Sequence, residues 1–143
     1  NINMSIEKVL YTAHATVTGG RNGHGRGETG LELDLAVPRE MGGAGAPGTN
    51  PEELFAIGYA ACFMGALGLV AGKEKRALPP DTTIQSAVGI GPQGAGFGIQ
   101  VHLNVHIPGL SQERTHALIE KAHAVCPYSN ATRGNIDVVL TAA

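Results

Sequence analysis

The strongest constraint on the fold of this chain is residues 54–71, which contain no charged side chain and are mostly apolar. A helix of this length approaches the length needed to cross a bilayer, but a helix that is apolar all round is also typical of the centre of a globular protein. The stretch is rich in Gly and Ala, poor in large aliphatic side chains, and directly preceded by an acidic helix start. The sequence therefore favours a buried central helix over a membrane span, and we expect no membrane partner.

The start of this helix is encoded in consecutive residues. Asn50 is a suitable N-cap, and Pro51 fits the first helical position. Glu52 and Glu53 fall in the first turn, where carboxylates face the positive end of the helix dipole, and Glu53 completes the spacing of a capping box. Gly72 and the basic run after it mark the end of the helix. Because so short a chain surrounds a buried helix most easily by pairing with a copy of itself, we expect a homodimer.

The other hydrophobic patterns predict an α+β fold. A second helix begins after the N-cap Ser111 and ends at Pro127. Residues 19–30 form a glycine-rich turn between strands, and residues 91–96 connect two strands as a hairpin. Strands are predicted at residues 8–18, 31–37, 82–90, 97–107 and 135–143. Because strands and helices do not alternate regularly, we expect helices packed against a mostly antiparallel sheet.

Composition limits the cellular setting and the partners. The chain has no repeat and no linker, so we expect a single domain over residues 1–143, with residues 1–3 as an addition before the natural start at Met4. No signal peptide opens the chain, which favours a cytoplasmic location. The net charge of −2 provides no basic field for nucleic acid. Two cysteines are too few for the disulfide framework of a small secreted domain.

Two groups of residues imitate ligand-binding motifs. Residues 25–30 and 89–94 match the spacing G-x-G-x-x-G, but a strand rather than a helix follows each, so no dinucleotide site is expected. Two histidine pairs share a face of a predicted strand or helix, about 13 Å apart on the strand and about 10 Å apart on the helix, which is too far for one metal ion. These histidines are His102 with His106 and His116 with His123. Solvated faces explain all four, and no metal or other bound cofactor is expected.

The two cysteines leave two interpretations open. Cys62 belongs to a strip of small residues with Gly58 and Ala66, so it fits a close helix contact simply by being small. Alternatively, if the two helices pack side by side, Cys62 is held in a rigid helix and Cys126 lies at a movable helix end. That arrangement suits a peroxidatic and resolving pair.

A reactive Cys62 requires a nearby cation. Apolar surroundings raise the pKa of a thiol and leave it unreactive unless a positive charge is directed at it. The candidate cations on turns or glycine-rich segments are Arg21, Arg26 and Arg133. Glu52 is a carboxylate that can hold such an arginine in place.

Three motifs carry a resemblance to a known family. They are TGGRNG at residues 18–23, PREMGGAGAPGTNPEELFAIGYAACFMGAL at residues 38–67, and CPYSNATRGN at residues 126–135. Together they resemble the organic hydroperoxide resistance proteins of the Ohr/OsmC superfamily, and the similarity runs nearly from end to end. The resemblance implies an intertwined homodimer with mostly antiparallel sheets packed around two long helices per chain.

The resemblance also implies a thiol-dependent peroxidase that reduces organic hydroperoxides to alcohols. By motif position, Cys62 is the peroxidatic thiolate, Cys126 the resolving cysteine, Arg21 the catalytic arginine and Glu52 its carboxylate partner. No cofactor is bound, and the expected reductant is an external dithiol, either dihydrolipoamide or the dihydrolipoyl group of a lipoylated protein. The apolar side chains of Leu54, Phe55, Ile57, Phe63 and Met64 would favour an alkyl or acyl tail over hydrogen peroxide.

One geometric constraint accompanies these assignments. Glu52 and Cys62 lie ten residues apart, so one straight helix separates them by about 15 Å along its axis, too far for a single arginine to bridge comfortably. We expect either a break in the helix near Gly58 or a contribution of Glu52 or Arg21 from the partner chain. Two alternative functions also remain: an OsmC-type peroxidase of broader specificity, and a non-catalytic disulfide redox sensor.

Overall fold

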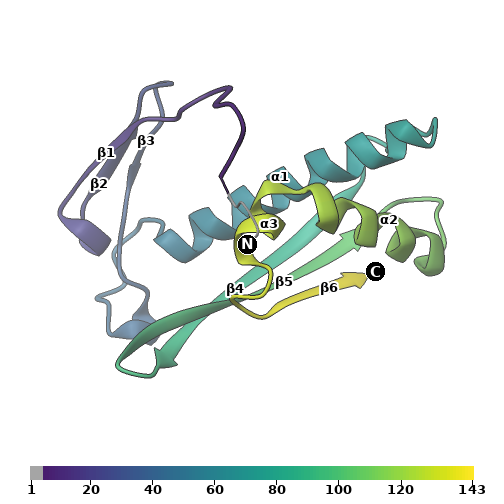
Figure 1. Cartoon of the computed structure of the whole chain (residues 1–143). Coiled ribbons are helices and arrows are strands. Elements are labelled where there is room, and N and C mark those ends of the chain that lie inside the picture. The colour runs from purple at the N-terminus through teal and green to yellow at the C-terminus, as the bar shows by residue number, and fades with distance from the viewer. Residues whose placement is uncertain (1–4) are drawn as a thin grey trace. The chain divides into compact units, whose positions relative to one another are not determined.

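The computed structural model describes residues 5–143, and the chain forms two compact units, Asn1–Pro51 and Glu52–Ala143 (Figure 1). Each unit has its own three-stranded sheet. The single domain over residues 1–143 remains a prediction. The expectation for residues 1–3 lies outside the described residues. The α+β class is confirmed, because helices and mostly antiparallel strands form the structure.

The N-terminal unit contains a small antiparallel sheet in the order β1-β2-β3. Its elements are β1 (Ala15–Thr18), the 3-10 turn η1 (Gly20–Asn22), β2 (His24–Gly27), β3 (Glu32–Asp34) and the 3-10 turn η2 (Arg39–Met41). The strands predicted at residues 8–18 and 31–37 are therefore present but shorter.

Strand β2 corrects the prediction that residues 19–30 are only a turn. Its glycines lower strand propensity, which hid the strand in the sequence. In the structure, Gly25 is buried opposite both neighbouring strands, and a Cβ there would lie 3.3 Å from Cδ1 of Leu33 and 3.8 Å from Cγ2 of Val17. Glycine thus permits close packing of side chains from the flanking strands over the centre of the sheet.

The C-terminal unit combines a long helix, a hairpin, two consecutive helices and a final strand. Its elements are α1 (Pro51–Lys73), β4 (Thr83–Gln93), β5 (Gly96–His106), α2 (Gln112–Val125), α3 (Pro127–Thr132) and β6 (Val138–Ala142). The sheet order is β4-β5-β6, with β4 and β5 antiparallel and β5 and β6 parallel. The start of α1 at Pro51 and the hairpin are both confirmed.

Helix α2 also begins where the sequence predicted. Ser111 is its N-cap, and the Ser111 hydroxyl accepts a 3.2 Å hydrogen bond from the backbone N–H of Arg114. The prediction that the helical segment ends at Pro127 was incomplete, because α3 begins at that residue. Proline cannot continue α2 but is a favourable first residue for a new helix, so one residue ends the first and starts the second.

The core of the C-terminal unit lies between its sheet and its helices. Figure 1 shows α1 and α2 over the same face of the sheet. On β5, the side chains of Val101, Leu103 and Val105 are buried against these helices, whereas His102 and His106 point to the opposite, exposed face, as predicted. The helices contribute Tyr59, Phe63, Leu67, Leu118, Ile119 and Ala122 to the same core.

Within one chain, only one face of helix α1 enters the core, so burial of the whole helix stays a prediction for the homodimer. Ile57 and Leu69 on its other side are 62% and 54% exposed, and Gly65 and Gly68 are exposed as well. Among the described residues, α1 alone has the length and composition of a membrane span. Its buried face nevertheless packs against the sheet, as in the core helix of a globular unit.

The N-cap of α2 gives a direct test of this local structure. Replacing Ser111 with Ala removes the acceptor for the Arg114 N–H, so the free energy of unfolding should fall by about 1 kcal/mol. Ser111→Asp retains an acceptor and should stay close to wild type. Urea unfolding followed by circular dichroism, at fixed protein concentration, measures both. Equal stability of the Ala variant and wild type would contradict the assigned cap.

Candidate thiol site

The structure brings the two cysteines together although they are 64 positions apart in sequence. Cys62 lies in the middle of α1, and Cys126 lies between α2 and α3. Both are free thiols, and the S–H of Cys126 donates to the sulfur of Cys62 over an Sγ–Sγ distance of 3.7 Å. A disulfide requires about 2.05 Å, so an oxidant could join the two sulfurs after only a small shift of either residue.

Cys126 occupies the corner between two helices. It is the C-cap of α2 and the N-cap of α3, with an extended backbone, and its N–H donates to the carbonyl of Ala122 at 2.9 Å. Its side chain is fully buried, whereas Cys62 is half-buried. The helix end predicted to be movable is therefore followed at once by α3, whose own contacts determine where Cys126 lies.

The surroundings of Cys62 oppose its ionisation. Burial raises the pKa of the Cys62 thiol, and the neighbouring Cys126 thiol raises it further, while a hydrogen bond from the backbone of Tyr128 acts in the opposite direction. Burial is the largest of these effects. A reactive thiolate at this position therefore needs an additional positive charge, in line with the requirement predicted from the sequence.

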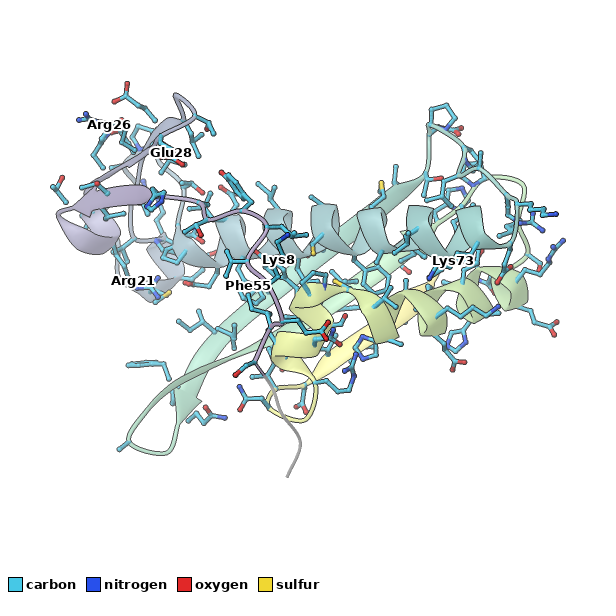
Figure 2. The ribbon with its side chains drawn as sticks, turned by 45° about the horizontal axis from the view of Figure 1, so that its top comes forward. Lys8, Arg21, Arg26, Glu28, Phe55 and Lys73 are labelled. Atoms are coloured by element: carbon cyan, nitrogen blue, oxygen red, sulfur yellow. The ribbon has the colours of Figure 1, made fainter. Side chains whose placement is uncertain are left out.

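Arg21, labelled in Figure 2, belongs to η1 in the N-terminal unit. The glycines of the TGGRNG motif are required by the backbone conformation of this turn. Gly19 and Gly20 have left-handed backbone conformations, with φ of 74° and 58°, and a Cβ at Gly23 would lie 1.7 Å from the carbonyl oxygen of Thr18. The glycines therefore shape the turn that presents Arg21, while its catalytic role stays a prediction.

The other two candidate cations have partners within their own units. Nε of Arg26 lies 3.8 Å from a carboxylate oxygen of Glu32 on the surface of the N-terminal sheet. Arg133 donates one guanidinium N–H to Oδ1 of Asn130 at 2.9 Å and another to the backbone carbonyl of His123. Arg133 thus serves to attach the end of α3 to α2.

Glu52 lies in the first turn of α1, and Lys73 is the last residue of the same helix. Figure 2 labels Phe55, one turn after Glu52, and Lys73, so the two ends of the helix can be located there. Helix α1 is continuous from Pro51 to Lys73, so the first of the two expected alternatives, a break near Gly58, is wrong, and a contribution from the partner chain stays a prediction. Gly58 instead allows close packing, since a Cβ there would lie 3.0 Å from the hydroxyl of Tyr128. Glu52 and Cys62 on one chain therefore remain about 15 Å apart along the helix axis.

A mostly apolar cavity of about 640 Å³ adjoins α3, a feature not predicted from the sequence; Gln93, Thr132 and Asn135 are its polar lining residues. Its apolar and aromatic walls are Phe55, Phe97, Ile99, Pro127, Tyr128, Ala131 and Ile136. Of the five apolar residues predicted around Cys62, Phe55 lines this cavity, its ring 5.8 Å from that of Tyr128. Phe63 instead packs in the core. The other walls come mainly from α3, which was not predicted, and from Phe97 and Ile99 on β5, which carry no local sequence signal for such a role.

The histidines differ in their surroundings. His116 is exposed, with Nδ1 3.8 Å from a carboxylate oxygen of Glu120. His123, predicted on a solvated face, is half-buried, and its Nδ1 lies 2.8 Å from Oγ of Ser129. The prediction of a solvated face was wrong for His123 because α3, which was not predicted, covers this face of α2. Within residues 5–143, no three potential metal ligands cluster.

Comparison with known proteins identifies the family of the chain. Residues 42–141 match the model of the OsmC-like proteins. An organic hydroperoxide resistance protein of Xanthomonas axonopodis pv. citri is 58% identical over 140 residues, covering 97% of this chain and 99% of the relative. The chain belongs to the OsmC-like family. Within it, the chain is a member of the organic hydroperoxide resistance (Ohr) subfamily.

Solved structures agree with this assignment. The crystal structure of an organic hydroperoxide resistance protein of Legionella pneumophila has a TM-score of 0.87 and 51% identity, covering 95% of this chain and 99% of that chain. A Vibrio cholerae structure, described as a putative organic hydroperoxide resistance protein with captopril bound in one of the active sites, has a TM-score of 0.87 and 49% identity. It covers 99% of this chain and 96% of that one.

The environment of His123 predicts a pH dependence of stability. Burial lowers the pKa of His123 below its ordinary value of 6.5, and the charge of Arg133 lowers it further. Because the unfolded chain then binds the proton more tightly than the folded chain, this residue contributes stability above about pH 6.5 that is lost as the pH falls through the folded-state pKa. Unfolding free energies at about pH 7.5 and about pH 5.5 should show this decline.

His123→Asn is the matched control for this measurement. Asparagine keeps an N–H donor close to the position of Nδ1 but does not titrate. The decline in stability between the two pH values should therefore be smaller in His123→Asn than in wild type, at equal protein concentration. Identical declines would show that His123 does not resist protonation in the folded protein.

Proposed function

We propose that this protein is a cysteine-based peroxidase that reduces organic hydroperoxides to alcohols. The observation that carries the proposal is the pair of free thiols 3.7 Å apart, one half-buried and one fully buried. The names of the relatives, organic hydroperoxide resistance proteins, support a role in resistance to these compounds. A soluble cytoplasmic protein, with neither a membrane nor nucleic acid as partner, is part of the proposal.

The proposed reaction has three balanced steps. The Cys62 thiolate attacks one peroxide oxygen, the O–O bond breaks, and the alkoxide takes a proton and leaves as the alcohol, which gives a sulfenic acid on Cys62. The Cys126 thiol then attacks the sulfenic sulfur, the S–S bond forms and water leaves. An external dithiol, proposed to be dihydrolipoamide or a lipoylated protein, reduces the disulfide and is itself oxidised to a disulfide.

Arg21 and Glu52 complete the proposed site. A guanidinium beside the Cys62 sulfur counters the effect of burial on its pKa and stabilises charge on the peroxide oxygens during attack. Glu52 orients that guanidinium. Because α1 is continuous and separates Glu52 from Cys62 of the same chain, we propose an intertwined homodimer in which the partner supplies Glu52 or Arg21.

The apolar cavity beside Tyr128 supports a hydroperoxide with an alkyl or aromatic tail. Each methylene buried there contributes about 0.8 kcal/mol, which hydrogen peroxide cannot gain. Tyr128 lines this cavity, and its backbone forms a hydrogen bond with the Cys62 thiol, so the cavity wall and the thiol are adjacent.

A steady-state assay with cumene hydroperoxide and dihydrolipoamide tests the function. Wild type should show sustained turnover, and Cys62→Ser should show none above background. Arg21→Gln should lower the rate about 100-fold, the usual cost of one group that stabilises transition-state charge, whereas the surface variant Arg26→Gln should not.

Three outcomes of this assay would oppose the proposal. Full activity of Cys62→Ser would indicate two inert core thiols. Formation of the disulfide without sustained turnover under any dithiol would indicate a redox sensor. Equal turnover of hydrogen peroxide and cumene hydroperoxide would indicate an OsmC-type peroxidase of broader specificity.

Mixed dimers test whether the site is shared between chains. The Cys62→Ser and Glu52→Gln variants should each be inactive or impaired, but a mixed dimer would join the intact Cys62 of one chain to the intact Glu52 of the other. After random exchange of subunits in a two-fold dimer, about a quarter of wild-type activity should return. A mixture of Cys62→Ser and Arg21→Gln tests in the same way whether the partner supplies the arginine. If neither mixture recovers activity, Arg21, Glu52 and Cys62 act from one chain and the shared site is refuted.

A further inference from the structure

A row of buried hydrogen bonds connects α3 to both long helices behind the thiol pair. The hydroxyl of Tyr59 on α1 lies 2.8 Å from Oγ of Ser129 and 3.2 Å from Oγ1 of Thr132, both on α3. Nδ1 of His123 on α2 lies 2.8 Å from the same Ser129 oxygen. Tyr59 and Ser129 are fully buried. We call Tyr59, Ser129 and His123 the α3 clamp.

The hydrogen bonds of the clamp can all be satisfied in one direction. His123 Nδ1–H donates to Ser129, Ser129 donates to Tyr59, Tyr59 donates to Thr132, and Thr132 donates to the backbone carbonyl of Tyr128 at 2.9 Å. Each hydroxyl then donates once and accepts once, as its chemistry allows. Because removal of one member leaves a buried group unpaired, the members act as a unit.

The clamp fixes the position of α3, whose beginning contacts Cys62. Helix α3 has six residues, too few to be stable by itself, so its position depends on such tertiary contacts. Two groups at its beginning meet the Cys62 sulfur: the thiol of Cys126 and the backbone of Tyr128. A displacement of α3 by about 1 Å would disturb both contacts together.

We propose that Tyr59, Ser129 and His123 are positioning residues for the step that forms the disulfide. This inference rests on the proposed function, in which the Cys126 sulfur attacks the Cys62 sulfenic acid and water leaves. The competing step is attack by a second hydroperoxide, which converts the sulfenic acid to a sulfinic acid and releases an alcohol. By holding Cys126 next to Cys62, the clamp favours the disulfide over this irreversible oxidation.

Tyr59→Phe and Ser129→Ala test the inference, since each removes one hydroxyl and little volume. In rapid-quench mass spectrometry with cumene hydroperoxide, disulfide formation should slow about tenfold or more. Consumption of the first equivalent should slow less, because it loses only the contact from the Tyr128 backbone to Cys62 and does not involve Cys126. The fraction of Cys62 recovered as sulfinic acid under excess hydroperoxide should rise accordingly. The double variant should be no slower than the slower single variant, because the clamp acts as a unit.

Two further variants separate positioning from general stability. Ser111→Ala makes the same chemical change at the other end of α2 and should leave the ratio of disulfide to sulfinic acid unchanged. His123→Asn keeps a donor for Ser129 and should form the disulfide faster than His123→Ala. Wild-type rates in both hydroxyl variants, or an equal effect of Ser111→Ala, would overturn the inference.

Oxidation by diamide makes the test independent of peroxidase activity. Diamide forms the Cys62–Cys126 disulfide from the two thiols without a hydroperoxide, so slower formation in Ser129→Ala supports the clamp even if wild type consumes no hydroperoxide. Unchanged rates with diamide and with hydroperoxide would refute it. An inactive wild-type enzyme with a diamide effect would refute only the proposed function.

Discussion

The contact between Cys62 and Cys126 depends on how α1 packs against the corner between α2 and α3. Two sulfurs that are remote in sequence meet at 3.7 Å because both long helices cover the same face of one sheet and α3 turns back immediately after Cys126. The corner in turn depends on Pro127, which ends one helix and starts the next. Helix packing thus determines whether the two thiols can react with each other.

The same packing creates a chemical conflict. Burial brings the thiols together, but it also raises the pKa of Cys62 and so keeps the sulfur protonated. The contact from the backbone of Tyr128 opposes this effect only in part. The proposed use of Cys62 as a nucleophile therefore requires a positive charge in an otherwise apolar site, and the arginine of the TGGRNG turn is the residue proposed to supply it.

Local signals in the sequence predicted local structure well. The cap before Pro51, the cap at Ser111 and the hairpin between β4 and β5 each depend on residues that are neighbours in the chain. Strand β2 was hidden because its glycines are favoured only by the strands on either side, and α3 was hidden because six residues form a helix only against tertiary contacts. The number of residues between the cysteines does not determine the distance between their sulfurs. The half-buried position of His123 and the close packing of Gly58 both depend on α3, so neither could be predicted before α3 was known.

Two features of α1 that look unrelated have one common explanation in the proposed homodimer. The first is its exposed side, where Ile57 and Leu69 lie beside Gly65 and Gly68, an apolar surface that a close neighbouring helix would cover. The second is its continuity, which separates Glu52 from Cys62 on the same chain. A bent helix would have brought Glu52 to Cys62 within one chain, but Gly58 packs against Tyr128 and the helix does not bend. A second copy of the chain would cover the exposed apolar side of α1. It could also bring a carboxylate or guanidinium close to Cys62, because a partner residue is not held at a fixed distance from Cys62 by the same helix.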